Sequence, residues 1–109
     1  MNFCSIKKSD FAKKHSENRF KSPYFILFIN KNSLDYSRYG IVVTKKNGNA
    51  VKRNKIKRWM KNSLYNNIKN FDIKGYDFII IANRYYDFNR ANYNSINTSI
   101  NEAITKNFK

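Results

Sequence analysis

The side chains that could perform acid–base or metal chemistry are few in this sequence. There is one histidine, His15, one cysteine, Cys4, and seven Asp or Glu residues among 109 positions. A single histidine cannot form an acid and base pair of histidines, and the acids form no two-carboxylate metal motif, although distant carboxylates can meet in a fold. No phosphate-cradling loop ending in GK[ST] occurs. We therefore expect no catalytic residue and no metal ligand in this chain.

The chemistry that the sequence does offer is anion binding, concentrated in the stretch KKNGNAVKRNKIKR, residues 45–58. This stretch holds seven Lys or Arg in fourteen residues and no acid, and ten Lys or Arg lie between Asp35 and Asp72 without an acid. The whole chain has a net charge of +15 at pH 7. Self-repulsion of that size destabilises a compact state unless an anionic partner neutralises it. We predict a polyanionic partner, either nucleic acid or an anionic membrane.

Local patterns predict the elements that position this basic stretch. Runs typical of buried strands cover residues 24–29 (YFILFI) and 39–45, the second ending at the first of two consecutive lysines. Gly48 permits a tight turn, and helical spacing follows over residues 50–68. The predicted buried face of that helix comprises Ile56, Trp59, Met60, Ser63, Leu64, Asn67 and Ile68. Asn54, Arg58 and Lys61 are predicted to lie on the opposite face.

Weaker signals complete the chain. Residues 9–17 are expected to form a short helix, residues 30–37 a turn, residues 77–82 (DFIIIA) a strand, and residues 90–105 a second long helix. A chain of 109 residues suffices for one domain with a core, here rich in aromatic residues. We predict a single α+β domain, residues 1–109, with helices packed on one sheet.

The start of the helix at residues 50–68 is predicted to hold phosphate. Its free N–H groups and macrodipole add to the positive field of the side chains, and an arginine can bridge two phosphate oxygens. Two other interpretations stay open. One is an ordinary solvated basic face, and the other is a helix lying on a membrane surface. The second is weakened because Trp59, Met60 and Leu64 are needed for the core of a small domain.

The same residues resemble a known family. KKNGNAVKRNKIKR is similar to the signature of the bacterial ribonuclease P protein component, roughly SKKxGNAVxRNRxKRxxR. The resemblance extends to a "DF" helix start at Phe11, to Arg38 and Gly40 before the basic stretch, and to DFIIIA in place of the family's DxVVIAR. It covers nearly the whole chain, weakly after Asn83.

This resemblance implies both a fold and a role. The implied fold is a ribosomal-protein-like α-β-β-β-α-β-α sandwich with a central, mostly antiparallel sheet and a left-handed βαβ crossover. The implied function is that of the protein subunit of an endoribonuclease, in which a catalytic RNA with bound Mg²⁺ removes the 5′ leader from precursor tRNA. The protein would bind the catalytic RNA and the single-stranded leader without performing the hydrolysis.

The resemblance also assigns residues by position. The expected catalytic-RNA-binding residues are Lys45, Lys46, Lys52, Arg53, Asn54, Lys55, Lys57, Arg58 and Lys61. The expected leader cleft holds Phe11, His15 and Phe28. Lys55 and Lys61 stand where the family usually has arginine, so they keep the charge but lose the bidentate fork. Asn83 replaces the arginine that usually ends the last strand, which leaves open whether Arg84 takes over its role.

Alternatives of other classes make different predictions. A structural RNA-binding protein, such as a ribosomal component, would also bind RNA but without dependence on the leader. An autonomous nuclease would cleave RNA alone. The single cysteine and the lack of a long apolar segment indicate a cytoplasmic protein, and we expect no membrane partner. The segregated charge disfavours a small-molecule substrate.

Overall fold

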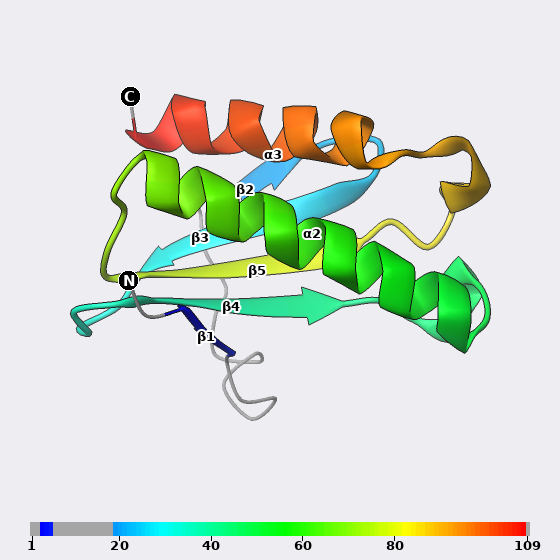
Figure 1. Ribbon diagram of the computed structural model, residues 1–109, viewed down its shortest axis with the longest axis horizontal. Helices are drawn as coiled ribbons and strands as arrows, with labels where there is room; N and C mark the ends of the chain where they lie inside the picture. Colours follow the sequence, from blue (N-terminus) through cyan, green and yellow to red (C-terminus); the bar gives the residue numbers. More distant parts are fainter. Residues whose placement is uncertain (1–2, 6–18, 109) are drawn as a thin grey trace.

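The chain is described by a computed structural model for residues 3–5 and 19–108. In this part, five strands form one sheet, and two long helices cover one of its faces (Figure 1). The helices are α2 (Ala50–Asn70) and α3 (Tyr93–Phe108). The helix expected at residues 9–17, with Phe11 and His15, lies outside the described residues.

The sheet is mixed. Its strands are β1 (Phe3–Ser5), β2 (Arg19–Lys21), β3 (Phe25–Lys31), β4 (Ser37–Val42) and β5 (Tyr76–Ala82), in the spatial order β1-β4-β5-β3-β2. β4 pairs parallel to both β1 and β5, whereas β3 pairs antiparallel to both β5 and β2. The α+β class is confirmed, with antiparallel pairing on both sides of β3 and parallel pairing on both sides of β4. The short strand β1, which showed no signal in the sequence, adds a second parallel pairing.

The unit β4–α2–β5 is a left-handed crossover. In Figure 1 both strands run from left to right, β5 lies above β4, and α2 lies in front of the sheet. Right-handed connections are the strong default for parallel strands, so this feature confirms what the family resemblance implied. The crossover places β5 between β4 and β3, at the centre of the sheet.

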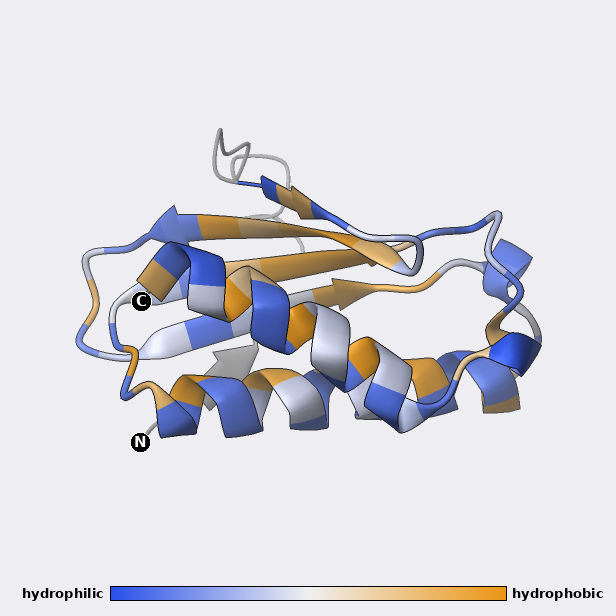
Figure 2. Ribbon diagram, turned by 90° about the horizontal axis from the view of Figure 1, so that it is seen from above, coloured by the Kyte–Doolittle hydropathy of each residue, from blue (hydrophilic) through white to orange (hydrophobic). Residues whose placement is uncertain are grey.

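The core lies between the sheet and the two helices. Alternate residues of β3 (Phe25, Leu27 and Ile29) are buried, and α2 contributes the predicted face, with Met60 and Leu64 fully buried. In Figure 2, which is coloured by hydropathy, apolar residues run along the strands and form a stripe along one side of each long helix. Alternation along the strand and three-to-four spacing along the helix bring these faces together. Trp59 is half-buried, whereas the other residues of the predicted face of α2 are buried.

Polar side chains join α2 to α3 inside this core. The hydroxyl of Ser63 donates to Oδ1 of Asn97 at 2.6 Å, and Asn101 donates to Oδ1 of Asn67 at 2.7 Å. Asn67 donates in turn to the Ser63 carbonyl at 2.8 Å. These bonds explain why two polar residues of α2, Ser63 and Asn67, are buried, because a buried polar group needs a partner.

A buried ion pair fixes the register of β4 against β5. Arg38 and Asp77 are paired residues of the parallel ladder, and the Arg38 guanidinium donates to both oxygens of the fully buried Asp77 carboxylate, at 2.9 and 2.7 Å. Asn32 donates a further bond of 2.8 Å to the same carboxylate. A one-residue slip would bury this carboxylate without its partners, so the pair opposes alternative registers.

Candidate nucleic-acid interface

A short turn presents the two lysines that follow β4. β4 ends at Val42, and Lys45 and Lys46 lie in the 3₁₀ turn η1 (Lys45–Asn47). The prediction that the strand continues to residue 45 was therefore wrong. The cause is the buried side chain of Asn47, whose Oδ1 accepts from the Thr44 N–H at 3.1 Å and bends the chain.

Asn47 also connects this turn to the end of β5. Its Nδ2 donates to the carbonyl of Asn83 at 3.1 Å. The two turns that follow the parallel strands β4 and β5 are therefore held together by one amide side chain. Lys45 and Lys46 are exposed on this anchored turn, so their ammonium groups project from a fixed backbone.

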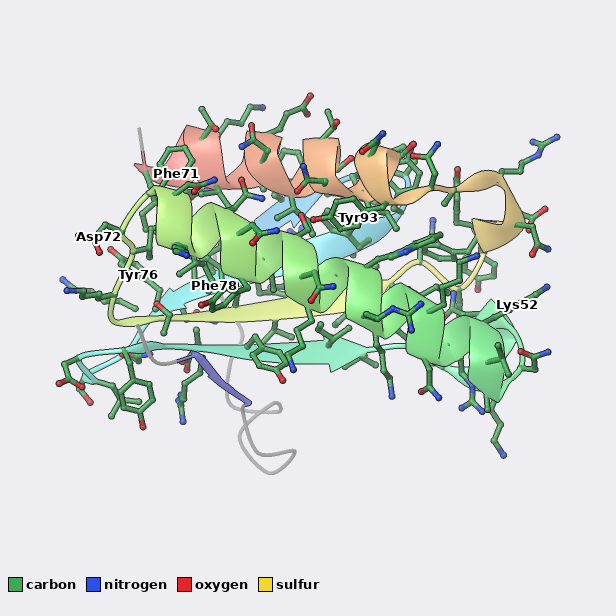
Figure 3. The ribbon with its side chains drawn as sticks, viewed as in Figure 1. Lys52, Phe71, Asp72, Tyr76, Phe78 and Tyr93 are labelled. Carbon is green, nitrogen blue, oxygen red and sulfur yellow. The ribbon has the colours of Figure 1, made fainter. Side chains whose placement is uncertain are left out.

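The start of α2 carries uncompensated positive charge. Asn49 is the N-cap, and its Oδ1 accepts from the backbone N–H of Lys52 at 2.9 Å. The first turn of the helix holds no acid, so nothing there offsets the positive end of the macrodipole. Figure 3 places Lys52 at this end and Phe71 with Asp72 at the other end of the helix. The end that the sequence predicts to bind phosphate is thus the end with the exposed lysines.

The outer surface of α2 is cationic along several turns. Of the nine residues predicted to bind the catalytic RNA, eight are exposed: Lys45, Lys46, Lys52, Asn54, Lys55, Lys57, Arg58 and Lys61. Within the described part of the chain, none of these cations forms an ion pair. We call these eight exposed residues the basic face. It is exposed charge on α2 and on the turn before it, without an ion-pair partner among the described residues, which suits a partner that carries many phosphates.

Arg53 differs from the rest of the predicted set. It is half-buried, and its Nε is buried without a hydrogen-bond partner in the described structure. Helical spacing explains this position, because Arg53 precedes the buried residues Ile56 and Met60 by three and seven positions. Its side chain therefore starts from the core side of α2, apart from the basic face.

The two lysines that stand in place of arginine both lie over aromatic rings. The ammonium of Lys55 is 4.8 Å from the centre of the Trp59 ring, and that of Lys61 is 5.6 Å from the centre of the Tyr39 ring. Such contacts attract the cation through the ring quadrupole. Trp59 follows Lys55 by four positions, one helical turn along α2, whereas Tyr39 belongs to β4 and is a long-range partner of Lys61.

Phe28 lies on the sheet face opposite the helices. Its neighbours in the strand, Leu27 and Ile29, are buried in the core, whereas Phe28 and Ile26 are half-buried on the other side. This alternation confirms the predicted division of faces. The sheet thus separates Phe28 from the basic face, and its expected cleft partners, Phe11 and His15, lie outside the described residues.

An aromatic cluster supports the turn after β5. Tyr86 packs edge to face against Tyr24 and Phe88, with ring centres 4.8 and 5.1 Å apart. Partial burial raises the pKa of the Tyr86 phenol, and the neighbouring Tyr24 adds to the effect. The Tyr86 phenol is therefore neutral at physiological pH, so it adds no negative charge beside the cations.

The described part of the chain contains neither a cluster of candidate metal ligands nor a membrane-spanning helix. No three His, Cys, Asp or Glu side chains gather there into a group that could hold a metal ion. No helix in the same part is long and apolar enough to cross a bilayer.

A model of the family described as Ribonuclease P matches residues 6–107. The chain belongs to the ribonuclease P protein family. The ribonuclease P protein component of Clostridioides difficile is 37% identical over 102 residues, covering 92% of this chain and 87% of that protein. That of Thermotoga petrophila is 42% identical over 64 residues. This match covers 59% of the present chain and spans about half, 54%, of the Thermotoga protein's length.

Solved structures of the family have the same fold. The RNase P protein of Staphylococcus aureus matches with a TM-score of 0.72 at 25% identity, over 100% of both chains. The Thermotoga maritima protein, in complex with 1-(4-fluorophenyl)-2-thiourea, matches with a TM-score of 0.71 at 34% identity, over 92% of both chains. The family and the fold class predicted from the sequence are thereby confirmed.

Proposed function

We propose that this chain is the RNA-binding protein subunit of ribonuclease P, which assists a catalytic RNA in removing the 5′ leader of precursor tRNA. The observation that carries the proposal is the basic face, whose cations have no ion-pair partner in the described structure. Family membership supplies the class of partner, which is RNA.

The basic face supports the docking of a folded RNA. Arg58 and Asn54 lie on the outer side of α2, and Lys45 and Lys46 extend the charge to the neighbouring turn. The Asn49 cap leaves other N–H groups of the first turn available to phosphate oxygens. These contacts neutralise phosphates without reading bases, so we propose the catalytic RNA as their partner and assign the leader elsewhere.

The leader is assigned to the opposite side of the sheet. Phe28 is half-buried there, and an aromatic ring can stack on any unpaired base. With the catalytic RNA on the helix side and the leader on the sheet side, one small domain would hold both at once. Phe11 and His15 remain proposed members of the same cleft.

We propose that Mg²⁺ is held mainly by the RNA subunit. The described residues do not fit a protein-built magnesium site, because no three acidic, His or Cys side chains converge. Among the described residues, the fully buried carboxylate is that of Asp77, which accepts hydrogen bonds from Arg38 and Asn32. The contribution of this chain is therefore positive charge, which replaces part of the counterion screening that the two RNAs otherwise require.

Reconstitution tests this proposal. The protein is added to the catalytic RNA of its own organism, and cleavage of precursor tRNA is measured at low Mg²⁺. We expect the rate to rise on addition of the protein. An unchanged rate over the whole titration would refute the assignment.

A second measurement separates the proposed subunit from a general structural RNA-binding protein. We expect the complex of protein and catalytic RNA to bind precursor tRNA more tightly than mature tRNA, since only the precursor carries a leader. Equal affinities would favour a ribosomal-type role. A mutant of the Staphylococcus aureus RNase P protein, 31% identical to this chain, is described as defective in mRNA degradation activity. For this chain, cleavage by rigorously purified, RNA-free protein would support an autonomous nuclease.

A further inference from the structure

Two adjoining hollows lie between the first turns of α2 and the segment that follows β5. In Figure 1 this segment turns back at the same end of the molecule as the start of α2. The hollows measure about 100 and 200 Å³, and both are lined by Lys52 of α2 and by two residues of the 3₁₀ turn η2 (Phe88–Arg90). Together they reach the lower end of the usual range for ligand sites, about 300 Å³. We call them the flank groove, whose walls include Lys46, Lys52, Lys55, Trp59, Phe88 and Asn89.

The smaller hollow is the apolar end of the flank groove. Trp59 and Phe88 line it from its two sides, one from α2 and one from η2. Phe88 is only 8% exposed, and its ring packs edge to face against Tyr86 with the ring centres 5.1 Å apart. Trp59 packs against the core but is only half-buried. A hollow between two such rings suits a flat aromatic ligand.

The larger hollow is the charged end. Lys46 and Lys52 line it, and Lys55 adds a third cation at the neighbouring hollow. The one acid among the lining residues is Asp87, whose Oδ1 accepts from the backbone N–H of Asn89 at 3.0 Å. Positive charge is therefore in excess around the flank groove. A ligand that joins an anionic group to a flat ring matches both ends, and a nucleotide is such a ligand.

The two walls are connected before any ligand arrives. The amide of Asn47, in the turn before α2, donates to the carbonyl of Asn83 at 3.1 Å. The same carbonyl accepts from the N–H of Tyr86 at 3.2 Å, which leads directly into η2. In η2, the N–H of Ala91 donates to the Phe88 carbonyl at 3.2 Å. Because both walls are held to the end of β5, less ordering remains to be done on binding.

Asn89 gives the flank groove a group that can recognise a base. Its side chain is exposed and lines both hollows. An amide can donate and accept hydrogen bonds at once, and the edges of unpaired bases are read by groups of this kind. The exposed lysines supply charge alone, so Asn89 is the group that could favour one base over another.

We propose that the flank groove binds one unpaired nucleotide of the catalytic RNA. The base lies against Trp59 beside Phe88, the Asn89 amide bonds to its edge, and Lys46 and Lys52 hold the adjoining phosphate. A paired base has neither a free face nor a free edge, so the nucleotide is unpaired.

The position of the flank groove selects the catalytic RNA as the partner. The three lysines that line it belong to the basic face, whereas the leader is assigned to the opposite side of the sheet. The inference rests on the proposed function. It adds contact with one base to the phosphate contacts that the basic face makes.

The test measures the affinity of the protein for its catalytic RNA over a range of salt concentrations. Trp59→Leu should weaken binding about fivefold or more, the usual effect of one base stack. Its logarithmic salt slope should equal that of the wild type, because no phosphate contact is lost. Trp59→Phe, which keeps a ring, should bind within about twofold of the wild type. Base-specific methylation should find one unpaired base that the wild type protects and that Trp59→Leu leaves reactive.

A second variant is independent of packing, since Trp59 also contacts the core. Asn89→Ala should weaken binding about twofold or more, through the loss of a hydrogen bond to the base. Its thermal midpoint should be that of the wild type, because the Asn89 side chain is exposed. Asn94→Ala is the matched control. It removes another exposed amide, on α3 and outside the flank groove, and should bind as the wild type does.

The outcomes separate the nucleotide site from the proposed function. If Trp59→Leu and Asn89→Ala bind the catalytic RNA as the wild type does, the nucleotide site is refuted and the proposed function stands. A reduced salt slope for Trp59→Leu would also refute it, because the change would then act through phosphate contacts. If the wild-type protein itself does not raise cleavage of precursor tRNA by the catalytic RNA, the proposed function fails.

Discussion

Gly48 and Lys52 are in such close contact that a side chain at Gly48 would collide with the lysine. A Cβ atom at position 48 would lie 2.9 Å from Cδ and 3.1 Å from Cβ of Lys52. The backbone of Gly48 has a φ of +126°, a conformation that L-residues rarely adopt. Lys45 and Lys46 lie in the turn before Gly48. This turn is therefore packed against the first turn of α2 through Gly48.

Gly48→Ala should therefore weaken both the fold and RNA binding. We expect the free energy of unfolding to fall by about 1–3 kcal/mol from backbone strain, as measured by urea denaturation. Affinity for the catalytic RNA should fall as well, since Lys52 must move. Gly75→Ala is the matched control, because Gly75 also has a positive φ, of +79°, but lies away from the basic face. It should destabilise the fold while RNA affinity, measured well below its melting temperature, stays unchanged.

Arg38→Met should destabilise the protein strongly. Arg38 is not one of the residues of the basic face. The change leaves the fully buried Asp77 carboxylate without its guanidinium partner. We expect a loss of about 3–5 kcal/mol in the free energy of unfolding at neutral pH, the usual result of breaking a buried pair. Chemical denaturation measures it. A loss below about 1 kcal/mol would show that the pair does not stabilise the register of β4 and β5.

Asn97→Ala should loosen the contact between α2 and α3. It removes the acceptor of the Ser63 hydroxyl and one of the Asn67 partners. We expect a loss of about 1–3 kcal/mol, because buried donors are left without an acceptor. Asn94→Ala, at an exposed position of α3, is the control and should change stability by less than about 0.5 kcal/mol. Equal effects of the two changes would contradict this role for the polar contact.

Phe28→Ala should weaken leader binding selectively. If a base stacks on Phe28, the affinity of the holoenzyme for precursor tRNA should fall by about 1–3 kcal/mol, while its affinity for mature tRNA stays the same. Fluorescence anisotropy with labelled tRNAs measures both. Phe28→Tyr keeps the ring and should restore precursor binding. A parallel loss for precursor and mature tRNA would place the role of Phe28 in folding instead.

Much of the fold was predictable because its signals are periodic and local. The buried face of α2 and the alternation along residues 24–29 follow from helical and strand spacing, and both are confirmed. Strand β1 escaped prediction because three residues are too few to show a period. The end of β4 was misplaced because it depends on the side chain of Asn47, whose partner Asn83 lies 36 positions away.

The site was predictable to a similar extent. Charge and motif spacing identified the basic face, but they grouped Arg53 with it. Its spacing of three and seven from Ile56 and Met60 was the available signal that it starts from the core side. The flank groove gave no signal, because its walls come from α2 and from the segment after β5. Such long-range meetings depend on the tertiary fold, which no local pattern specifies.

The salt dependence of binding to the catalytic RNA tests the basic face most directly. The dissociation constant is measured against salt concentration for the wild type, for Arg58→Ala on the basic face, and for Lys74→Ala. Lys74 is an exposed lysine beyond the other end of α2. We expect Arg58→Ala to weaken binding and to reduce the logarithmic salt slope by about 0.7–1, the loss of one phosphate contact, with Lys74→Ala like the wild type. Identical slopes for all three proteins would contradict the assignment of the basic face to RNA.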